Sequence, residues 1–201
     1  MDIFYKSKLK KINNMTNLSE FSLSGKLMAA LPVVCDEPFN RSVVYVHQHD
    51  DIGAYGFILN KRFPVQNAVS IAKSLGIQDY HNIYYGGPIS PNTGIIFHTP
   101  DYDNGMTVDV CDGVCMSAGM EILKNIRQGT GPSKYMIMLG FCEWASEQID
   151  DEVVGTAKSD YRPFWAFTKA TEEHFFSISQ TIPIWQGVIA QAAADRCAIL
   201  L

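Results

Sequence analysis

The sequence predicts a mixed α+β fold, built as a single domain from short strands with helices between them. Runs rich in β-branched and aromatic residues alternate with amphipathic windows that end on glycine. Some neighbouring strands are joined by tight turns and others by helical crossovers, which argues for a mixed sheet. The chain has 201 residues, 47% hydrophobic and 18% charged, enough to build one buried core.

The strand predictions rest on local composition. "SVVYVHQH" (residues 42–49) is β-branched and apolar on both faces, so we expect it to be buried on both sides. The turn "DDIGAYG" then returns the chain as a hairpin. "KYMIMLGF" is unbroken in its apolar character, which is typical of a central strand. We expect strands over residues 23–31, 42–49, 55–60, 82–87, 94–98, 106–111 and 134–141.

Four helices are predicted from apolar residues at three- and four-residue spacing. Residues 65–76 and 116–129 each end on a glycine that can cap a helix. Residues 144–155 start with acidic side chains, which complement the helix dipole. Residues 184–194 form the last. The expected buried faces are Val65, Ala68, Val69, Ala72 and Leu75 in the first helix, Met120, Leu123 and Ile126 in the second, and Ala145, Ile149 and Val153 in the third.

Charge and cysteine usage narrow the class of protein. The formal net charge is −5, so no basic surplus favours direct binding to nucleic acid. No apolar run approaches the ~18 residues of a membrane-spanning helix. Five scattered cysteines do not form a disulfide framework, which indicates a reduced, cytoplasmic protein. Four lysines make residues 1–20 a basic, flexible tail, and we expect residues 21–201 to form the domain.

Three stretches together resemble the signature blocks of the YqgE/AlgH family, also called UPF0301. They are "FNRSVVYVHQHDDIGAYGFILNK", "GGPISPNTGIIFHT" and "LGFCEWASEQIDDEV". The match extends over residues 23–195. The resemblance implies a bifurcated sheet that closes into a pseudo-barrel flanked by helices. It implies little about activity, because the family is largely uncharacterised and is described as putative transcriptional regulators. We find no helix-turn-helix pattern with a basic second helix.

Polar residues at the predicted strand ends suggest a ligand cleft. Gly86 and Gly87 allow close backbone approach before Pro88 fixes a turn, and their amides could hold an anion. The alternative for this stretch is a structural corner. His98 ends the following strand and could act in acid–base chemistry. Arg41 starts one strand and Asn60 ends another. The predicted cleft therefore comprises Arg41, Asn60, Gly86, Gly87, Pro88 and His98.

Other candidate residues have simpler structural explanations. His47 and His49 would share one face of a strand, but a third metal ligand is missing. Cys142 follows a buried strand and could be an activated nucleophile, although the resemblance implies a small inert residue there. The indole of Trp144 would anchor a helix to the sheet and donate to a carbonyl. We therefore predict no metal, no cofactor and no catalytic residue.

The sequence favours a non-enzymatic domain that binds a small anionic ligand or a protein partner and serves regulation. Two alternatives stay open. One is a hydrolase or thiol-dependent enzyme that uses Cys142 or His98. The other is a transcriptional regulator that acts through a partner, because the acidic balance argues against direct contact with DNA.

Overall fold

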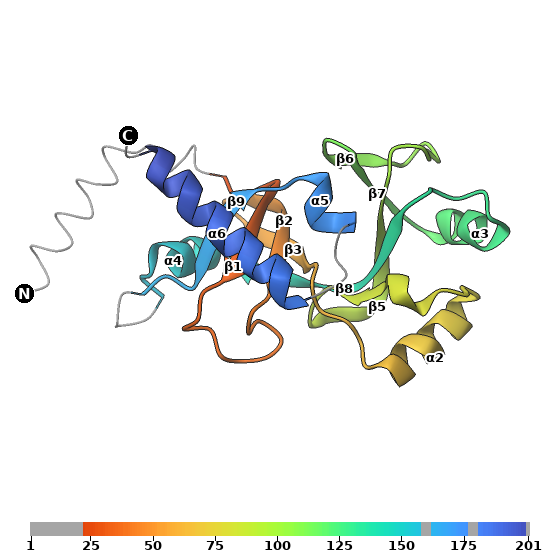
Figure 1. Ribbon diagram of the computed structural model, residues 1–201, viewed down its shortest axis with the longest axis horizontal. Coiled ribbons are helices and arrows are strands. Elements are labelled where there is room, and N and C mark those ends of the chain that lie inside the picture. Colours follow the sequence, from red (N-terminus) through yellow and green to blue (C-terminus); the bar gives the residue numbers. More distant parts are fainter. Residues whose placement is uncertain (1–21, 158–161, 177–180, 200–201) are drawn as a thin grey trace, which may run out of the picture.

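The computed structural model describes residues 22–157, 162–176 and 181–199. In this part of the chain, strands form one curled sheet with helices on its flanks (Figure 1). The predicted α+β class, with a bifurcated sheet that curls toward a barrel, is confirmed. The predicted basic tail, residues 1–20, lies outside the described residues.

The sheet has the strand order β6-β7-β5-β8-β3-β2-β1-β9. Neighbours in this order are antiparallel, whereas β4 lies off the path and runs parallel to β8. The strands are β1 (Lys26–Ala30), β2 (Val43–Asp50), β3 (Gly53–Ile58), β4 (Ile83–Tyr85), β5 (Ile89–His98), β6 (Val108–Cys111), β7 (Val114–Ala118), β8 (Tyr135–Ala145) and β9 (Trp165–Lys169).

Strand β8 belongs to both halves of the sheet. Residues 135–139 pair with β4 and β5, and residues 142–145 pair with β3. Between them Gly140 has φ +75°, a left-handed conformation that residues with a side chain rarely adopt. The strand bends there, and this bend is where the sheet divides.

Helices pack along both halves of the sheet. They are α2 (Val65–Leu75), α3 (Met120–Gln128), α4 (Gln148–Val154), α5 (Glu172–Phe176) and α6 (Thr181–Ile199), with a short 3-10 helix, η2 (Tyr80–Asn82). In Figure 1, α2 and α3 lie beside the half that contains β5 and β7, while α6 crosses β1 and β9. The Trp185 indole donates to the Ala30 carbonyl over 2.7 Å and ties α6 to β1. No described helix combines the length and apolar character needed to cross a bilayer.

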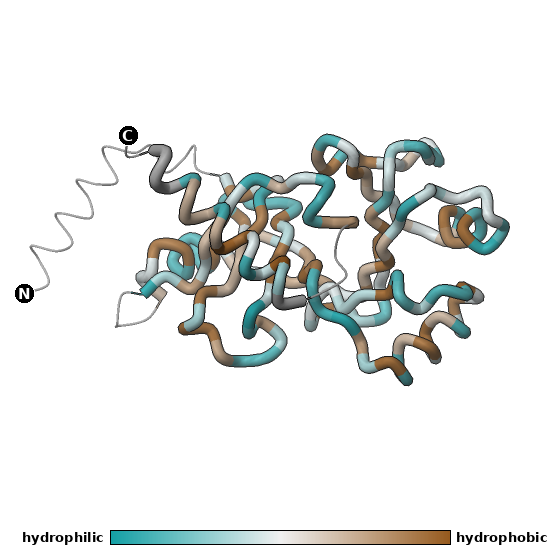
Figure 2. Tube along the Cα trace, in the orientation of Figure 1, coloured by the Kyte–Doolittle hydropathy of each residue, from teal (hydrophilic) through white to brown (hydrophobic). Residues whose placement is uncertain are grey.

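Both faces of β2 are buried over residues 43–46, whereas residues 47–50 are half-buried or exposed. The burial predicted for residues 42–49 is therefore confirmed only in the first half of the strand. Val43 and Tyr45 belong to the cluster beneath α5 and α6, whereas Val44 and Val46 belong to the cluster on the opposite face. Figure 2 shows hydrophobic and hydrophilic stretches alternating along the chain, as expected where buried strand segments are joined by exposed turns. In the first cluster the ring of Tyr45 packs edge-on against Phe97, with centroids 5.7 Å apart.

Two predicted helices begin later than expected. Residues 116–118 belong to β7, where Met116 pairs with Phe97, and α3 starts at Met120 after Gly119, which has φ +100°. Trp144 and Ala145 likewise extend β8, and α4 starts at Gln148. In both places residues expected in a helix extend a strand instead, because pairing with the neighbouring strand buries Ser117 and Trp144.

The predicted helix faces are also partly wrong. Val65 and Val69 of α2 are 62% and 45% exposed, and Met120 of α3 is 66% exposed. Ala68 and Ala72 of the predicted α2 face are buried as expected, and Leu123 and Ile126 of the predicted α3 face pack against the core beside the buried Ile122. Apolar spacing thus predicted the two helices, their C-terminal caps at Gly76 and Gly129, and part of each buried face.

Candidate functional site

The "GGP" stretch packs closely against the backbone of β8. A Cβ added to Gly86 would lie 2.3 Å from the carbonyl oxygen of Gly140, and one on Gly87 would lie 2.2 Å from the carbonyl carbon of Phe141. The Gly86 amide donates to the Leu139 carbonyl, and its carbonyl accepts from the Ile58 amide, each over 2.8 Å. The glycines thus let two backbones meet at the bend of β8, while Pro88 is exposed.

Asn60 lies next to this crossing, and both polar atoms of its side chain bond to backbone. It is 1% exposed, its Oδ1 accepts from the Val43 amide over 2.8 Å, and its Nδ2 donates to the Arg41 carbonyl over 2.9 Å. Arg41 has φ +54° and places its guanidinium 5.9 Å from the ring centre of Trp185. The structure therefore brings Arg41, Asn60 and Gly86 into one neighbourhood.

His98 lies outside that neighbourhood. It pairs with Tyr135, four residues along β8 from Leu139, which corresponds to about 13 Å of strand. The imidazole is fully buried, with Nδ1 2.8 Å from the Thr99 carbonyl and Nε2 2.9 Å from the Ser117 hydroxyl. Both ring nitrogens are thus already paired within the protein. Ligand binding around Arg41 stays a prediction.

The Cys142 thiol is shielded from solvent. Its residue is 1% exposed, Sγ lies 3.7 Å from the Gly86 carbonyl, and burial raises the pKa of the thiol to about 12. A thiol of this kind is inert as a nucleophile at neutral pH. The four described cysteines form no disulfide bond with one another.

Trp144 and Trp165 share one acceptor. Both indoles donate to Oε2 of Glu152 in α4, over 3.1 and 2.7 Å. Trp144 therefore links strand β8 to a helix, through a carboxylate instead of the carbonyl that we expected.

The two histidines of β2 do not share a face. A β-bulge between Val46 and Gln48 breaks the alternation, so that His47 stacks near Tyr55, with ring centres 5.1 Å apart. His49 instead pairs with Ala54 and places Nε2 3.2 Å from Asp150. The prediction that they face one way is wrong, and the described residues contain no group of three side chains suited to a metal ion.

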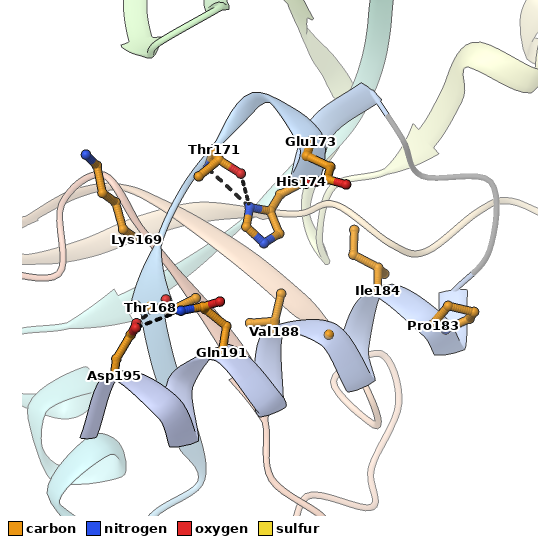
Figure 3. A pocket seen from close by; sticks show the side chains of 11 residues that line it. Thr168, Lys169, Thr171, Glu173, His174, Pro183, Ile184, Val188, Gln191 and Asp195 are labelled. Carbon is orange, nitrogen blue, oxygen red and sulfur yellow. Dashed lines mark hydrogen bonds between the residues drawn. The ribbon is translucent and has the colours of Figure 1, made fainter. Parts of the chain in front are cut away.

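A cavity of about 830 Å³ lies between α6 and the segment formed by β9 and α5, and we call it the α6 cavity (Figure 3). Its floor on α6 is apolar, and a Cβ on Gly187 would meet no atom within 4 Å. A volume of this size suits a small organic ligand. The residues that line it are Thr168, Lys169, Thr171, Glu173, His174, Pro183, Ile184, Gly187, Val188, Gln191 and Asp195.

His174 presents a hydrogen-bond donor to this cavity. Its Nδ1 lies 3.2 Å from the Thr171 amide and 2.8 Å from the Thr171 hydroxyl. Because the amide can only donate, Nδ1 is the acceptor and the proton sits on Nε2 in the neutral ring. Burial lowers the pKa of His174, which favours this neutral form. In Figure 3 Nε2 points toward α6, and the described residues give it no partner.

Asp195 forms the other polar end of the cavity. Its Oδ2 accepts from the Thr168 hydroxyl and its Oδ1 accepts from the Gln191 amide over 2.8 Å. These two hydrogen bonds lower the pKa of Asp195, which is therefore ionised at neutral pH. No basic side chain of the described residues forms an ion pair with it.

Two smaller cavities lie on the sheet. One of about 300 Å³ has an aromatic lining that includes Tyr55, Phe57 and Phe141. The other, of about 170 Å³, lies between Leu75 of α2 and Leu123 of α3. Both lack a convergence of polar groups like that of the α6 cavity.

Sequence reasoning missed the α6 cavity because residues 161–178 carry no clear periodicity. Two signals could have found it. Thr171 and His174 stand three residues apart at the start of α5, and Gly187 lies within the apolar first half of α6.

Comparison with known proteins agrees with the fold. The family model DUF179, described as AlgH-like, matches residues 27–196. A UPF0301 protein of Afipia carboxidovorans is 32% identical over 186 residues, covering 85% of this chain and 89% of the relative. One from Brucella melitensis is 35% identical over 143 residues, covering 65% of this chain and 71% of the relative.

Two solved structures share the fold. The solution structure of the AlgH protein from Pseudomonas aeruginosa superposes with a TM-score of 0.65 at 23% identity, covering 86% of this chain and 90% of that one. The crystal structure of a Corynebacterium diphtheriae protein superposes with a TM-score of 0.63 at 17% identity, covering 88% and 90%.

Proposed function

Because the chain belongs to the AlgH-like, UPF0301 family, whose fold specifies no activity, we propose that it is a non-enzymatic domain that binds a small ligand in the α6 cavity. The observation that supports this is that one cavity with an apolar floor is lined by both the His174 Nε2 donor and the Asp195 carboxylate. The cytoplasmic location expected from the cysteines is part of this proposal.

The enzymatic alternatives have less support. A nucleophile must reach its substrate and ionise near neutral pH. Cys142 is buried, with its pKa raised to about 12. His98 has both ring nitrogens engaged. Neither of these groups opens onto the α6 cavity.

The proposal is tested by closing the cavity. Gly187→Phe adds a large side chain where a Cβ meets open space, so the fold tolerates it while the cavity volume falls. Ala193→Phe is the matched control, since Ala193 is exposed on the same helix and does not line the cavity. A fragment library is screened by ligand-observed NMR against all three proteins.

We expect fragments that bind the unmodified protein and the Ala193→Phe protein but not the Gly187→Phe protein. If every fragment that binds does so equally well to the Gly187→Phe protein, the cavity is not the binding site. Circular dichroism of the three proteins verifies that each is folded.

Regulation through a protein partner is a second candidate. The exposed apolar side chains of Val65 and Val69 on α2 and of Met120 on α3 favour it, because apolar side chains presented to solvent are typical of protein-binding surfaces. In a strain with a regulatory phenotype, Val65→Asp with Val69→Asp would abolish that phenotype, whereas Gly187→Phe would leave it intact. The reverse pattern would support the α6 cavity instead.

A further inference from the structure

Resting on the proposed function, we propose that the α6 cavity takes a cationic α-amino carbonyl compound with an apolar side chain. This is the chemistry of an amino-acid amide or of the free N-terminus of a short peptide. Its ammonium group would meet Asp195, its carbonyl oxygen would accept from His174 Nε2, and its side chain would lie on α6.

The charges on the cavity lining favour a cation. Glu173 and Asp195 carry carboxylates, whereas Lys169 is the one lysine or arginine among the described residues that line the cavity. In Figure 3 the Lys169 ammonium points away from α6. Neither carboxylate forms an ion pair with a described residue. The cavity therefore carries excess negative charge.

The Asp195 carboxylate has free acceptor sites for an ammonium group. A carboxylate offers about four lone-pair sites. Thr168 and Gln191 occupy one on each oxygen, so each oxygen can accept one more hydrogen bond. The two neutral donors also fix the orientation of the carboxylate without cancelling its charge. A ligand ammonium would supply the missing counter-charge and a charge-assisted hydrogen bond.

The donor on His174 sets the second requirement. Nδ1 is held as an acceptor by the Thr171 amide, so Nε2–H must meet an acceptor on the ligand. A purely basic ligand, such as an alkyl polyamine, offers none in its protonated form. A ligand that carries both a carbonyl oxygen and an ammonium group would satisfy both His174 and Asp195, and an α-amino carbonyl compound carries this pair of groups.

The apolar floor accounts for the remaining part of the ligand. Ile184 and Val188 lie on the cavity side of α6. Gly187, which has no side chain, leaves open space beside them. From Ile184 to Asp195 the helix rises about 16 Å at ~1.5 Å per residue. An extended peptide spans up to ~3.5 Å per residue, so this length holds a peptide of about four residues. A single amino-acid amide would fill only one end.

The test uses two probes, L-leucinamide and the tripeptide amide Leu-Ala-Ala-NH2, each in free and N-acetylated form. Binding is measured by isothermal titration calorimetry to the unmodified protein and to the Asp195→Asn, Gly187→Phe and Asp112→Asn proteins. Asp195→Asn keeps the shape and removes the charge. Asp112→Asn is the matched control, because it makes the same change at an exposed site outside the cavity.

We expect acetylation and Asp195→Asn each to weaken binding about tenfold, the equivalent of one charge-assisted hydrogen bond. Gly187→Phe should abolish binding, and Asp112→Asn should leave it unchanged. Tighter binding of the tripeptide amide than of leucinamide would identify a peptide N-terminus, and equal binding an amino-acid amide.

The outcomes separate this inference from the function on which it rests. If neither probe binds while library fragments still depend on Gly187, the ligand class is wrong and the binding site stands. Binding that survives both acetylation and Asp195→Asn would also overturn the ligand class. Binding of either probe that survives Gly187→Phe would overturn the site itself for these ligands.

Discussion

Replacing Gly86 by alanine tests one of the closest backbone contacts among the described residues. Gly86 is buried, and its φ is not in the left-handed region, so the only new demand of alanine is space for its Cβ. That atom would lie 2.3 Å from the Gly140 carbonyl oxygen. The neighbour is backbone of β8 and cannot rotate away, so the two chain segments must separate.

The cost follows from what this separation disturbs. Overpacking a well-packed core costs ~1–3 kcal/mol. Lengthening the hydrogen bonds that Gly86 makes with Leu139 and Ile58 costs about 1 kcal/mol each. We therefore expect the free energy of unfolding of Gly86→Ala to fall by about 3–5 kcal/mol, and its Tm by about 6–20 °C in a domain of this size.

Urea denaturation followed by circular dichroism measures this change. Gly187→Ala is the control, because its Cβ meets no atom within 4 Å and alanine favours a helix by up to about 1 kcal/mol. A Gly86→Ala protein within 0.5 kcal/mol of the unmodified protein would refute the reasoning, and "GGP" would then be an open loop instead of a structural crossing.

Three further predictions concern other parts of the chain. A thiol reagent at neutral pH should label the exposed Cys35 but not Cys142, whose pKa is about 12, as read by mass spectrometry of digested protein; equal labelling would contradict the burial of Cys142. Ile122→Ala should lower the free energy of unfolding by about 2–5 kcal/mol and Met120→Ala by less than about 0.5, in urea titrations; the opposite order would restore the α3 face expected from the sequence. Hydrogen bonds from Thr99 and Ser133 lower the pKa of Asp101, so its contribution to stability is present above its unfolded pKa and is lost as the pH falls through its folded value. Asp101→Asn should therefore flatten the acid limb of a stability–pH curve, and an unchanged limb would show that Asp101 does not contribute to it.

Local pattern predicted the elements whose partners are close in sequence. The hairpin of β2 and β3 and the C-terminal caps of α2 and α3 depend on residues within a few positions of one another, and all were found. The chain around Met116 and Trp144 depends on distant partners, Phe97 for the first and Ala54 of β3 for the second. Helix propensity was overridden there by pairing that a single sequence does not reveal.

The candidate site was harder to predict for the same reason. Polar residues at strand ends suggested a cleft. However, Asn60 bonds to backbone and His98 bonds to Ser117, so both side chains already have hydrogen-bond partners within the protein. The α6 cavity brings together Thr168 and Asp195, residues of a strand and a later helix whose proximity follows from how α6 crosses the sheet. Residue type alone does not distinguish a polar side chain that bonds within the protein from one that lines a cavity.

The pairing of β1 with β9 joins the first described strand to one near the end of the chain. During synthesis Leu27 has to wait for Thr168 to leave the ribosome, and the outer edge of β3 stays uncovered until the second half of β8 arrives. Contacts of such long sequence separation slow folding. Nascent chains halted before residue 165 should therefore be the form of this protein that most needs a chaperone.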